Sequence, residues 1–214
     1  MEYIAKQWEM EFFHNLKGLR EQQSEEIRYI ERYFLLYAAP VLTGAQPSSL
    51  VCFHKRFRGA WNQCTDRLCE TTGLCVTMLY ENQDTFALLI YDRRKMAAIF
   101  RCPVAVELLK AHGYPHAASL PHMLACLKTR FCECSFPHEI GIFLGYPPKD
   151  VCAFIQKNGR EYLCCRYWKV YHDEQSAIET FRCIDEAKAR AIKLLTQNVP
   201  LNMAAQMLSA TQTA

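Results

Sequence analysis

The sequence predicts an α+β fold, a mixed or antiparallel sheet of about four to five strands covered by helices and preceded by a helical N-terminal region. Apolar residues recur at helical spacing in the first part of the chain. Two apolar arms flanking four polar residues predict a hairpin over 74–91, and beyond it helical stretches alternate with single strands. With 214 residues, we expect one α+β domain over 1–198, helical over 1–48, and a short helix or flexible tail over 199–214.

Two helices are expected before residue 40. Each carries an apolar stripe, and Ser24 suits the N-cap of the second helix. The stripes are formed by Trp8, Phe12, Leu16 and Leu19, and by Ile27, Ile30, Phe34 and Tyr37. Pro40, Gly44 and Pro47 are then expected to break the helical pattern into a loop.

A short strand over 50–53 and a helix over 56–71 follow, and Gly73 suits the end of that helix. The hairpin has arms at 74–80 and 85–91, nearly all apolar, which indicates a position inside a sheet. Three helices come next, one after Asp92, one from Pro103 to Gly113, and one capped by Ser119.

The second half predicts a strand over Glu139–Leu144, a helix from Pro147 to Gly159, and an aromatic strand over Tyr162–Tyr171. Asp173 suits the N-cap of a long helix, and Pro200 separates a short last helix.

The net charge of +3 is too small to indicate a nucleic-acid partner. No apolar run approaches the ~20 residues that cross a bilayer, and no signal peptide is evident at the N-terminus, so we expect no membrane partner and a cytoplasmic location. In that compartment most of the twelve cysteines are expected to be small buried hydrophobes rather than a disulfide framework.

The first candidate site is the pair His138-Glu139, catalytic candidates at the mouth of the predicted strand. Histidine titrates near neutral pH and serves as acid, base or metal ligand. The alternative is a histidine that only holds the loop by hydrogen bonds.

Cys132, Cys134 and His138 form the second candidate, since thiolates and imidazole are ligands of Zn²⁺ and Fe²⁺. A fourth ligand is left open among His112, His116 and His122. A cysteine nucleophile is a further alternative, although the sequence carries no known signature for one.

The aromatic strand is the third candidate. Alternation would place Tyr167, Lys169 and Tyr171 on one face, with Trp168 and Val170 on the other. Together with Tyr146, such a face suits a planar cofactor such as a flavin or haem. The alternative is aromatic core packing under a helix.

The segments Pro137-His-Glu-Ile-Gly-Ile-Phe-Leu-Gly-Tyr-Pro147, Asp150-Val151 and Tyr167-Trp-Lys-Val-Tyr171 resemble a bacterial family known only as a domain of unknown function. This family is found mainly in anaerobic Gram-positive bacteria, and the resemblance spans roughly residues 35–185. It implies a cytoplasmic protein in which the His138-Glu139 region is a family feature, and it brings no activity with it.

We therefore expect a binding or accessory protein in metal or redox-cofactor metabolism, with a small molecule or a protein as partner. Its ligand would lie near His138, Glu139, Tyr146 and the 167–171 segment. The alternatives are an enzyme that uses His138 as general acid or base, and a protein-interaction module that binds no ligand.

Overall fold

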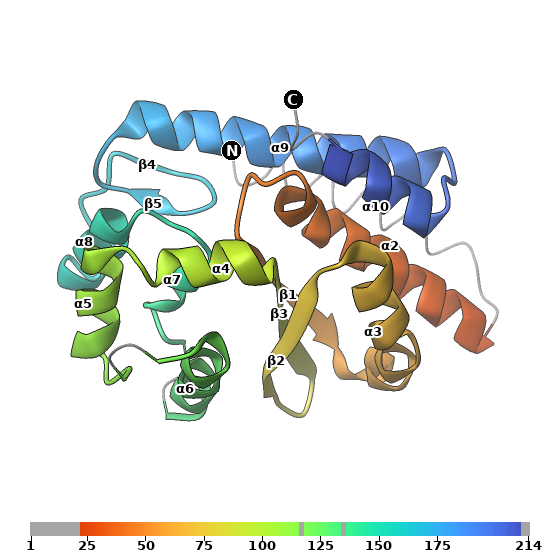
Figure 1. Cartoon of the computed structure of the whole chain (residues 1–214), viewed down its shortest axis with the longest axis horizontal. Coiled ribbons are helices and arrows are strands. Elements are labelled where there is room, and N and C mark those ends of the chain that lie inside the picture. The colour runs from red at the N-terminus through yellow and green to blue at the C-terminus, as the bar shows by residue number, and fades with distance from the viewer. Residues whose placement is uncertain (1–21, 116–117, 134–135, 211–214) are drawn as a thin grey trace.

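The structure is a computed structural model that describes residues 22–115, 118–133 and 136–210. Its helices include one 3₁₀ turn, and its strands form two separate antiparallel sheets (Figure 1). The helices are α2 (Gln22–Leu42), η2 (Lys55–Phe57), α3 (Arg58–Thr72), α4 (Arg93–Ile99), α5 (Pro103–Ala111), α6 (Leu120–Glu133), α7 (Ile140–Phe143), α8 (Pro148–Gln156), α9 (Glu174–Thr196) and α10 (Leu201–Ser209). The strands are β1 (Ser48–His54), β2 (Cys75–Glu81), β3 (Thr85–Tyr91), β4 (Cys164–Cys165) and β5 (Lys169–Val170).

The larger sheet has the order β1-β3-β2, so β3 is its central strand. The tight β2–β3 turn is closed by Asn82, whose side-chain oxygen accepts the backbone N–H groups of Asp84 at 2.9 Å and Thr85 at 2.8 Å. Every residue of β3 after Thr85 is buried, which explains why this arm reads as a continuous apolar run rather than as an alternating one.

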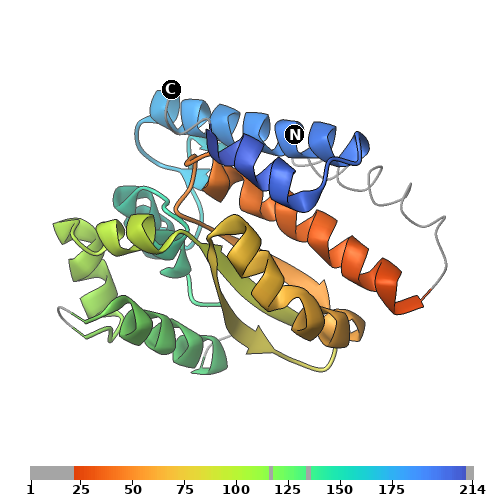
Figure 2. The same ribbon diagram turned by 45° about the vertical axis from the view of Figure 1, so that its right-hand side comes forward.

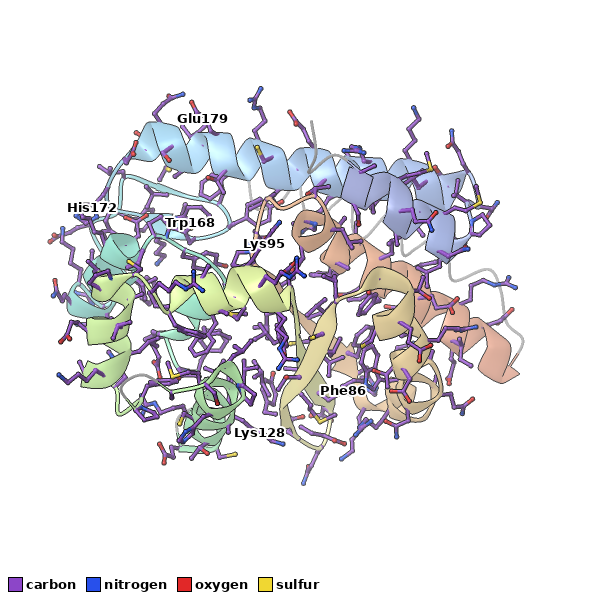
Figure 3. All side chains as sticks on the ribbon, in the orientation of Figure 1. Phe86, Lys95, Lys128, Trp168, His172 and Glu179 are labelled. Carbon is purple, nitrogen blue, oxygen red and sulfur yellow. The ribbon has the colours of Figure 1, made fainter. Side chains whose placement is uncertain are left out.

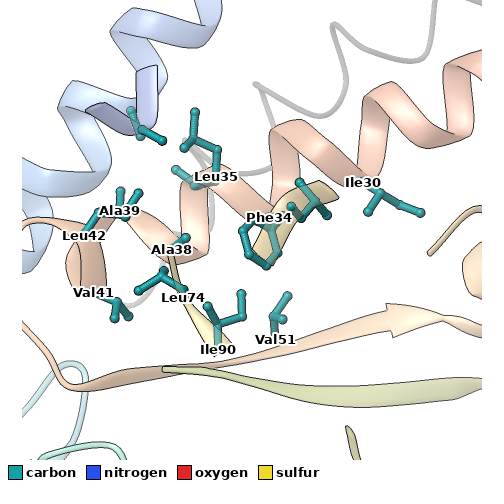
Figure 4. Close-up of a cluster of buried hydrophobic side chains, with 14 of the residues drawn as sticks. Ile30, Phe34, Leu35, Ala38, Ala39, Val41, Leu42, Val51, Leu74 and Ile90 are labelled. Atoms are coloured by element: carbon teal, nitrogen blue, oxygen red, sulfur yellow. The ribbon is translucent and has the colours of Figure 1, made fainter. Parts of the chain in front are cut away.

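Helices cover both faces of this sheet. Phe86, Leu88 and Ile90 of β3 face a core that includes α2, α3, α9 and α10, whereas Leu89 and Tyr91 face a second core built with α4 to α8. Figure 4 shows Phe34 and Ile30 of α2 pointing toward the sheet, and Figures 1 and 2 show α9 and α10 on the outer side of α2. Successive side chains of a strand point to opposite faces, so β3 serves both cores at once.

A third, smaller core joins the β4–β5 hairpin to α9. Trp168 and Val170 of the hairpin segment pack with Ala177 and Phe181 of α9. This contact holds the hairpin next to α7 and α8, where it forms one wall of the candidate site.

The α+β class and the helical region before β1 are confirmed. The five strands divide between a three-stranded and a two-stranded sheet, both antiparallel, rather than forming one sheet. The helix expected around Trp8 to Leu19 lies outside the described residues. The last helix, left open as packed or flexible, packs against α2, α3 and α9.

Three predicted elements are wrong in detail. The strand expected over Glu139–Leu144 is the short helix α7, whose four residues are all buried, so no polar alternation reveals its period. The strand expected over Tyr162–Tyr171 folds back on itself as β4 and β5. Pro40 does not end its helix, because it lies in the last turn of α2, which continues to Leu42.

Among the described residues, no helix is both long and apolar enough to cross a bilayer. The eleven cysteines that the structure describes are all free thiols.

Candidate functional site

A cavity of about 310 Å³ lies between α7, α8 and the β4–β5 hairpin. Most of its wall is apolar or aromatic, from Phe136, Ile140, Leu144, Tyr146, Val151, Phe154 and Trp168. Its polar lining consists of His138, Asp150, Cys165, Arg166, Tyr167 and Lys169. We call this space the aromatic cavity. Its volume is at the lower end of the range of ligand pockets, roughly 300–1,000 Å³.

His138 borders the aromatic cavity and is exposed. Its ring meets the edge of the Phe154 ring, with centroids 5.0 Å apart and planes at 72°, and lies 6.3 Å from the Phe136 ring. Its backbone carbonyl accepts the N–H of Gly141 at 3.2 Å, which opens the turn into α7. Within the described residues, no hydrogen bond to either nitrogen of the imidazole is found.

Glu139 points away from the aromatic cavity into the core. Its side chain is almost fully buried, and it accepts a hydrogen bond from Arg130 Nε at 2.8 Å and one from the Tyr114 hydroxyl at 3.4 Å. Burial, reinforced by the Glu139 carboxylate, raises the pKa of Tyr114 above its ordinary value. Glu139 therefore ties α7 to α6, and it does not share the cavity with His138.

Tyr146 and Trp168 form one side of the aromatic cavity. Their rings stack with centroids 4.9 Å apart, and Trp168 also meets Phe181 of α9 edge-on at 4.4 Å. Figure 3 shows Trp168 on the hairpin below α9. Burial raises the pKa of Tyr146 to about 12. A Cβ at Gly141 would lie 3.1 Å from the Tyr146 ring and 2.9 Å from Val151, so the glycine permits this packing.

Asp150 is the residue that the sequence interpretation missed as a site residue. Its buried carboxylate accepts Trp168 Nε1 at 2.9 Å, the backbone N–H groups of Tyr171 at 3.0 Å and His172 at 2.9 Å, and lies 3.2 Å from His172 Nδ1. The signal was present, because Asp150 precedes Phe154 by four residues and so shares its apolar helix face. A carboxylate on such a face needs partners from elsewhere in the fold.

The hairpin presents five consecutive residues, 165–169, to the aromatic cavity, and Tyr167, Trp168 and Lys169 are among them. The alternation that placed Trp168 on the face opposite Tyr167 and Lys169 is wrong, because residues 166–168 form a turn rather than a strand. Tyr171 does not line the cavity, and its backbone N–H is held by Asp150. Tyr167 donates its hydroxyl to Asp185 at 2.7 Å.

Among the described residues, the candidate metal ligands do not form a cluster. Cys132 is exposed at the end of α6, and Cys134 lies outside the described residues. In the parts of the chain that the structure describes, no three His, Cys, Asp or Glu side chains are grouped so that they could hold a metal ion.

Comparison with known proteins identifies a family and nothing more specific. The family described as "Protein of unknown function (DUF3793)" matches residues 34–204, a range that contains every residue lining the aromatic cavity. No curated protein and no solved structure matches the chain significantly. The resemblance to a family of unknown function is thereby confirmed, and since the match covers well over half of the sequence, the chain belongs to the DUF3793 family.

Proposed function

We propose that this protein binds a small organic molecule with a planar, largely apolar body in the aromatic cavity. One observation carries the proposal: His138 and Tyr146 of one sequence segment and Lys169 of another, all site candidates from the sequence, line the same cavity. Aromatic walls with a few polar groups are typical of small-molecule sites. The expected cytoplasmic location fits a metabolite as ligand.

The volume of the cavity limits the size of the ligand. A volume of about 310 Å³ suits a compact molecule with one or two rings better than a whole porphyrin or flavin nucleotide. Of the cofactors considered from the sequence, the ring portion of a flavin is the largest that this space supports. A zinc or iron role would depend on Cys134, together with Cys132 and His138, and stays a prediction for elemental analysis.

An enzymatic role for His138 is the second candidate, and a specific observation favours it. The imidazole is exposed, borders the cavity, and has neither nitrogen engaged by a described residue. Such a group can exchange a proton with a bound molecule near neutral pH. Glu139 does not take part in this reading, because its carboxylate is held by Arg130 and Tyr114.

The test begins with protein purified without oxygen, examined by native mass spectrometry, absorption spectroscopy and elemental analysis. We expect a small organic molecule to accompany the chain. A cavity-filling variant, Cys165→Phe, should lose it, because Cys165 lines the cavity. The matched control Cys183→Phe, at an exposed position on α9, should keep it.

Two outcomes would contradict simple binding in the aromatic cavity. Equal retention of the molecule by both variants would place it outside the aromatic cavity and overturn the proposal. If the wild type converts the molecule chemically and His138→Ala binds it without converting it, the protein is an enzyme rather than a simple binding protein.

A further inference from the structure

The aromatic cavity contains an ammonium group whose charge is not matched by any acid that the structure describes. Lys169 Nζ donates to the Gly159 carbonyl at 2.8 Å and lies over the rings of Tyr162, at 4.9 Å, and Phe154, at 5.7 Å. Among the residues that the structure describes, no carboxylate lies within ion-pair distance of it. Lys169 is only partly buried, so its ammonium group can take a further, anionic partner from a molecule bound in the cavity.

The backbone is shaped to hold this lysine. Gly159 has a φ of +70°, in the left-handed region that favours glycine. A Cβ at this position would lie 3.1 Å from the Phe154 ring and 3.3 Å from Lys169 Nζ. The glycine therefore leaves room for the ammonium to reach the carbonyl oxygen beside Phe154.

The other charges that line the cavity are already matched within the protein. Arg166 donates to Asp185 at 2.7 Å, and the second oxygen of that carboxylate accepts the Tyr167 hydroxyl. The Asp150 carboxylate uses both oxygens for Trp168, Tyr171 and His172. Both oxygens of Asp150 are thus engaged by groups of the protein, and no ion pair between Asp150 and Lys169 occurs in the described part of the chain.

His138 lies beside the same aromatic ring as Lys169. The imidazole centroid is 5.0 Å from the centroid of Phe154, and the ammonium is 5.7 Å from it. A hydrogen-bond donor and a cation thus flank one apolar surface at the edge of the cavity. Each of them lines the aromatic cavity and can therefore contact a molecule that lies against its aromatic walls.

On these grounds we infer that the ligand of the aromatic cavity is a small aromatic acid, whose anionic group pairs with Lys169 and whose ring packs against Phe154 and the Tyr146–Trp168 stack. This inference rests on the proposed function, and it restricts the ligand to molecules that carry a negative charge. A carboxylate and a phosphate monoester offer the same anionic oxygens, and the experiment distinguishes them.

The test uses benzoate, benzamide and phenyl phosphate, which share one ring and differ in the polar group. Their affinities for the full-length protein are measured by ligand-observed NMR titration. We expect benzoate or phenyl phosphate to bind at least tenfold more tightly than benzamide, and the tighter of the two identifies the acid. Binding of the anions should weaken as salt is added, because the lysine is only partly buried.

Variants assign the effect to Lys169. Lys169→Met keeps an unbranched side chain that is one atom shorter and uncharged, and it should lower the affinity for the anion about tenfold while it leaves benzamide unchanged. Lys169→Arg should restore most of the affinity. Lys149→Met, an exposed position on α8 outside the lining, is the control and should change nothing. Far-UV circular dichroism verifies that each variant is folded.

The outcomes distinguish the two proposals. If benzamide binds as tightly as the anions and Cys165→Phe abolishes both, the cavity binds ligands but the charge inference is wrong. If anion binding survives both Lys169→Met and Cys165→Phe, it occurs elsewhere, and the inference is again wrong. If no probe binds the wild type and no molecule accompanies it, the proposed function itself is overturned, and the inference with it.

Discussion

The buried carboxylate of Asp150 accepts the indole N–H of Trp168 at 2.9 Å, and this contact joins the first turn of α8 to the β4–β5 hairpin. The second carboxylate oxygen accepts the backbone N–H groups of Tyr171 and His172, just beyond β5. One side chain thus fixes both ends of the segment that carries Lys169. The two short strands pair only over Cys164–Cys165 and Lys169–Val170, so the Asp150 contacts add to a short ladder in holding this wall of the aromatic cavity.

The first prediction concerns Asp150. Asp150→Asn keeps the size of the side chain but replaces one acceptor oxygen with an NH₂ group, so either Trp168 or the backbone at 171–172 loses its partner. Hydrogen bonds to a charged group contribute about 1.5–3 kcal/mol each, so we expect a loss of about 2–4 kcal/mol in the free energy of unfolding. Urea denaturation measures it. The control Asp66→Asn, exposed on α3, should stay within about 0.5 kcal/mol, and an equal effect of both changes would contradict the role of Asp150.

The second prediction concerns Gly145, which ends the α7 segment with a φ of +81°. A Cβ there would lie 2.3 Å from Cδ of Pro47, in the loop before β1. Gly145→Ala should therefore cost more than about 3 kcal/mol, from the left-handed backbone together with the clash. Gly73→Ala is a matched control, because its φ is +69° and no atom lies within 4 Å of the added Cβ. Its cost should be about 1–2 kcal/mol, so equal losses in chemical denaturation would leave no role for the Pro47 contact.

The sequence predicted the elements whose signals are local. The hairpin of β2 and β3 follows from two apolar arms and a polar turn, and the start of α9 follows from Asp173, whose side chain accepts the Ser176 N–H. Gly73 likewise ends α3 in the left-handed conformation that the pattern indicated. These features depend on residues within a few positions of each other, so no knowledge of the tertiary fold is needed.

The errors arise where distant contacts decide the structure. The run Ile140–Phe143 is entirely buried in the second core, so its apolar residues show neither a helical nor a strand period. The turn at 166–168 is stabilised from α8 and α9, through Asp150 and Asp185, and neither residue is close in sequence. His138, Tyr146 and Lys169 were expected near one ligand, whereas Asp150, which holds Trp168 and the backbone at 171–172, was not recognised because its partners are distant in sequence.

The third prediction separates a ligand-binding histidine from one that supports the fold. The His138 ring is exposed and has no hydrogen bond from a described residue, so His138→Ala should change the free energy of unfolding by less than about 1 kcal/mol, mostly through the lost contact with Phe154. The same variant should bind the molecule that accompanies the wild type at least several-fold more weakly. Thermal and urea unfolding, together with native mass spectrometry, measure the two effects. A variant that no longer folds would show that the ring only supports the loop.

The fourth prediction assigns Glu139 to the fold rather than to the site. Glu139→Gln should lower the free energy of unfolding by about 1.5–3 kcal/mol, because a buried carboxylate loses its charge-assisted hydrogen bond with Arg130. Glu133→Gln removes the longer contact of Arg130, at 3.6 Å on the surface, and should cost less than about 1 kcal/mol. Neither variant should alter the affinity for a cavity ligand at temperatures where both are folded. A loss of affinity in Glu139→Gln alone would show that Glu139 contributes to ligand binding.

The fifth prediction concerns the alkaline limit of stability. Burial raises the pKa of Tyr146 to about 12, whereas in the unfolded chain this hydroxyl has its ordinary value near 10. The unfolded state then releases the proton first as the pH rises, so the contribution of Tyr146 is complete below about pH 10 and is lost as the pH passes 12. Tyr146→Phe keeps the stack with Trp168 but removes the titrating group. Between pH 9 and pH 12 the free energy of unfolding of the wild type should therefore fall by about 2 kcal/mol more than that of Tyr146→Phe. Urea unfolding across this range measures the difference, with Tyr162→Phe at an exposed position as the control. Parallel curves for the wild type and Tyr146→Phe would mean that water already reaches the hydroxyl, and that the wall of the aromatic cavity is more open than the contacts of Tyr146 indicate.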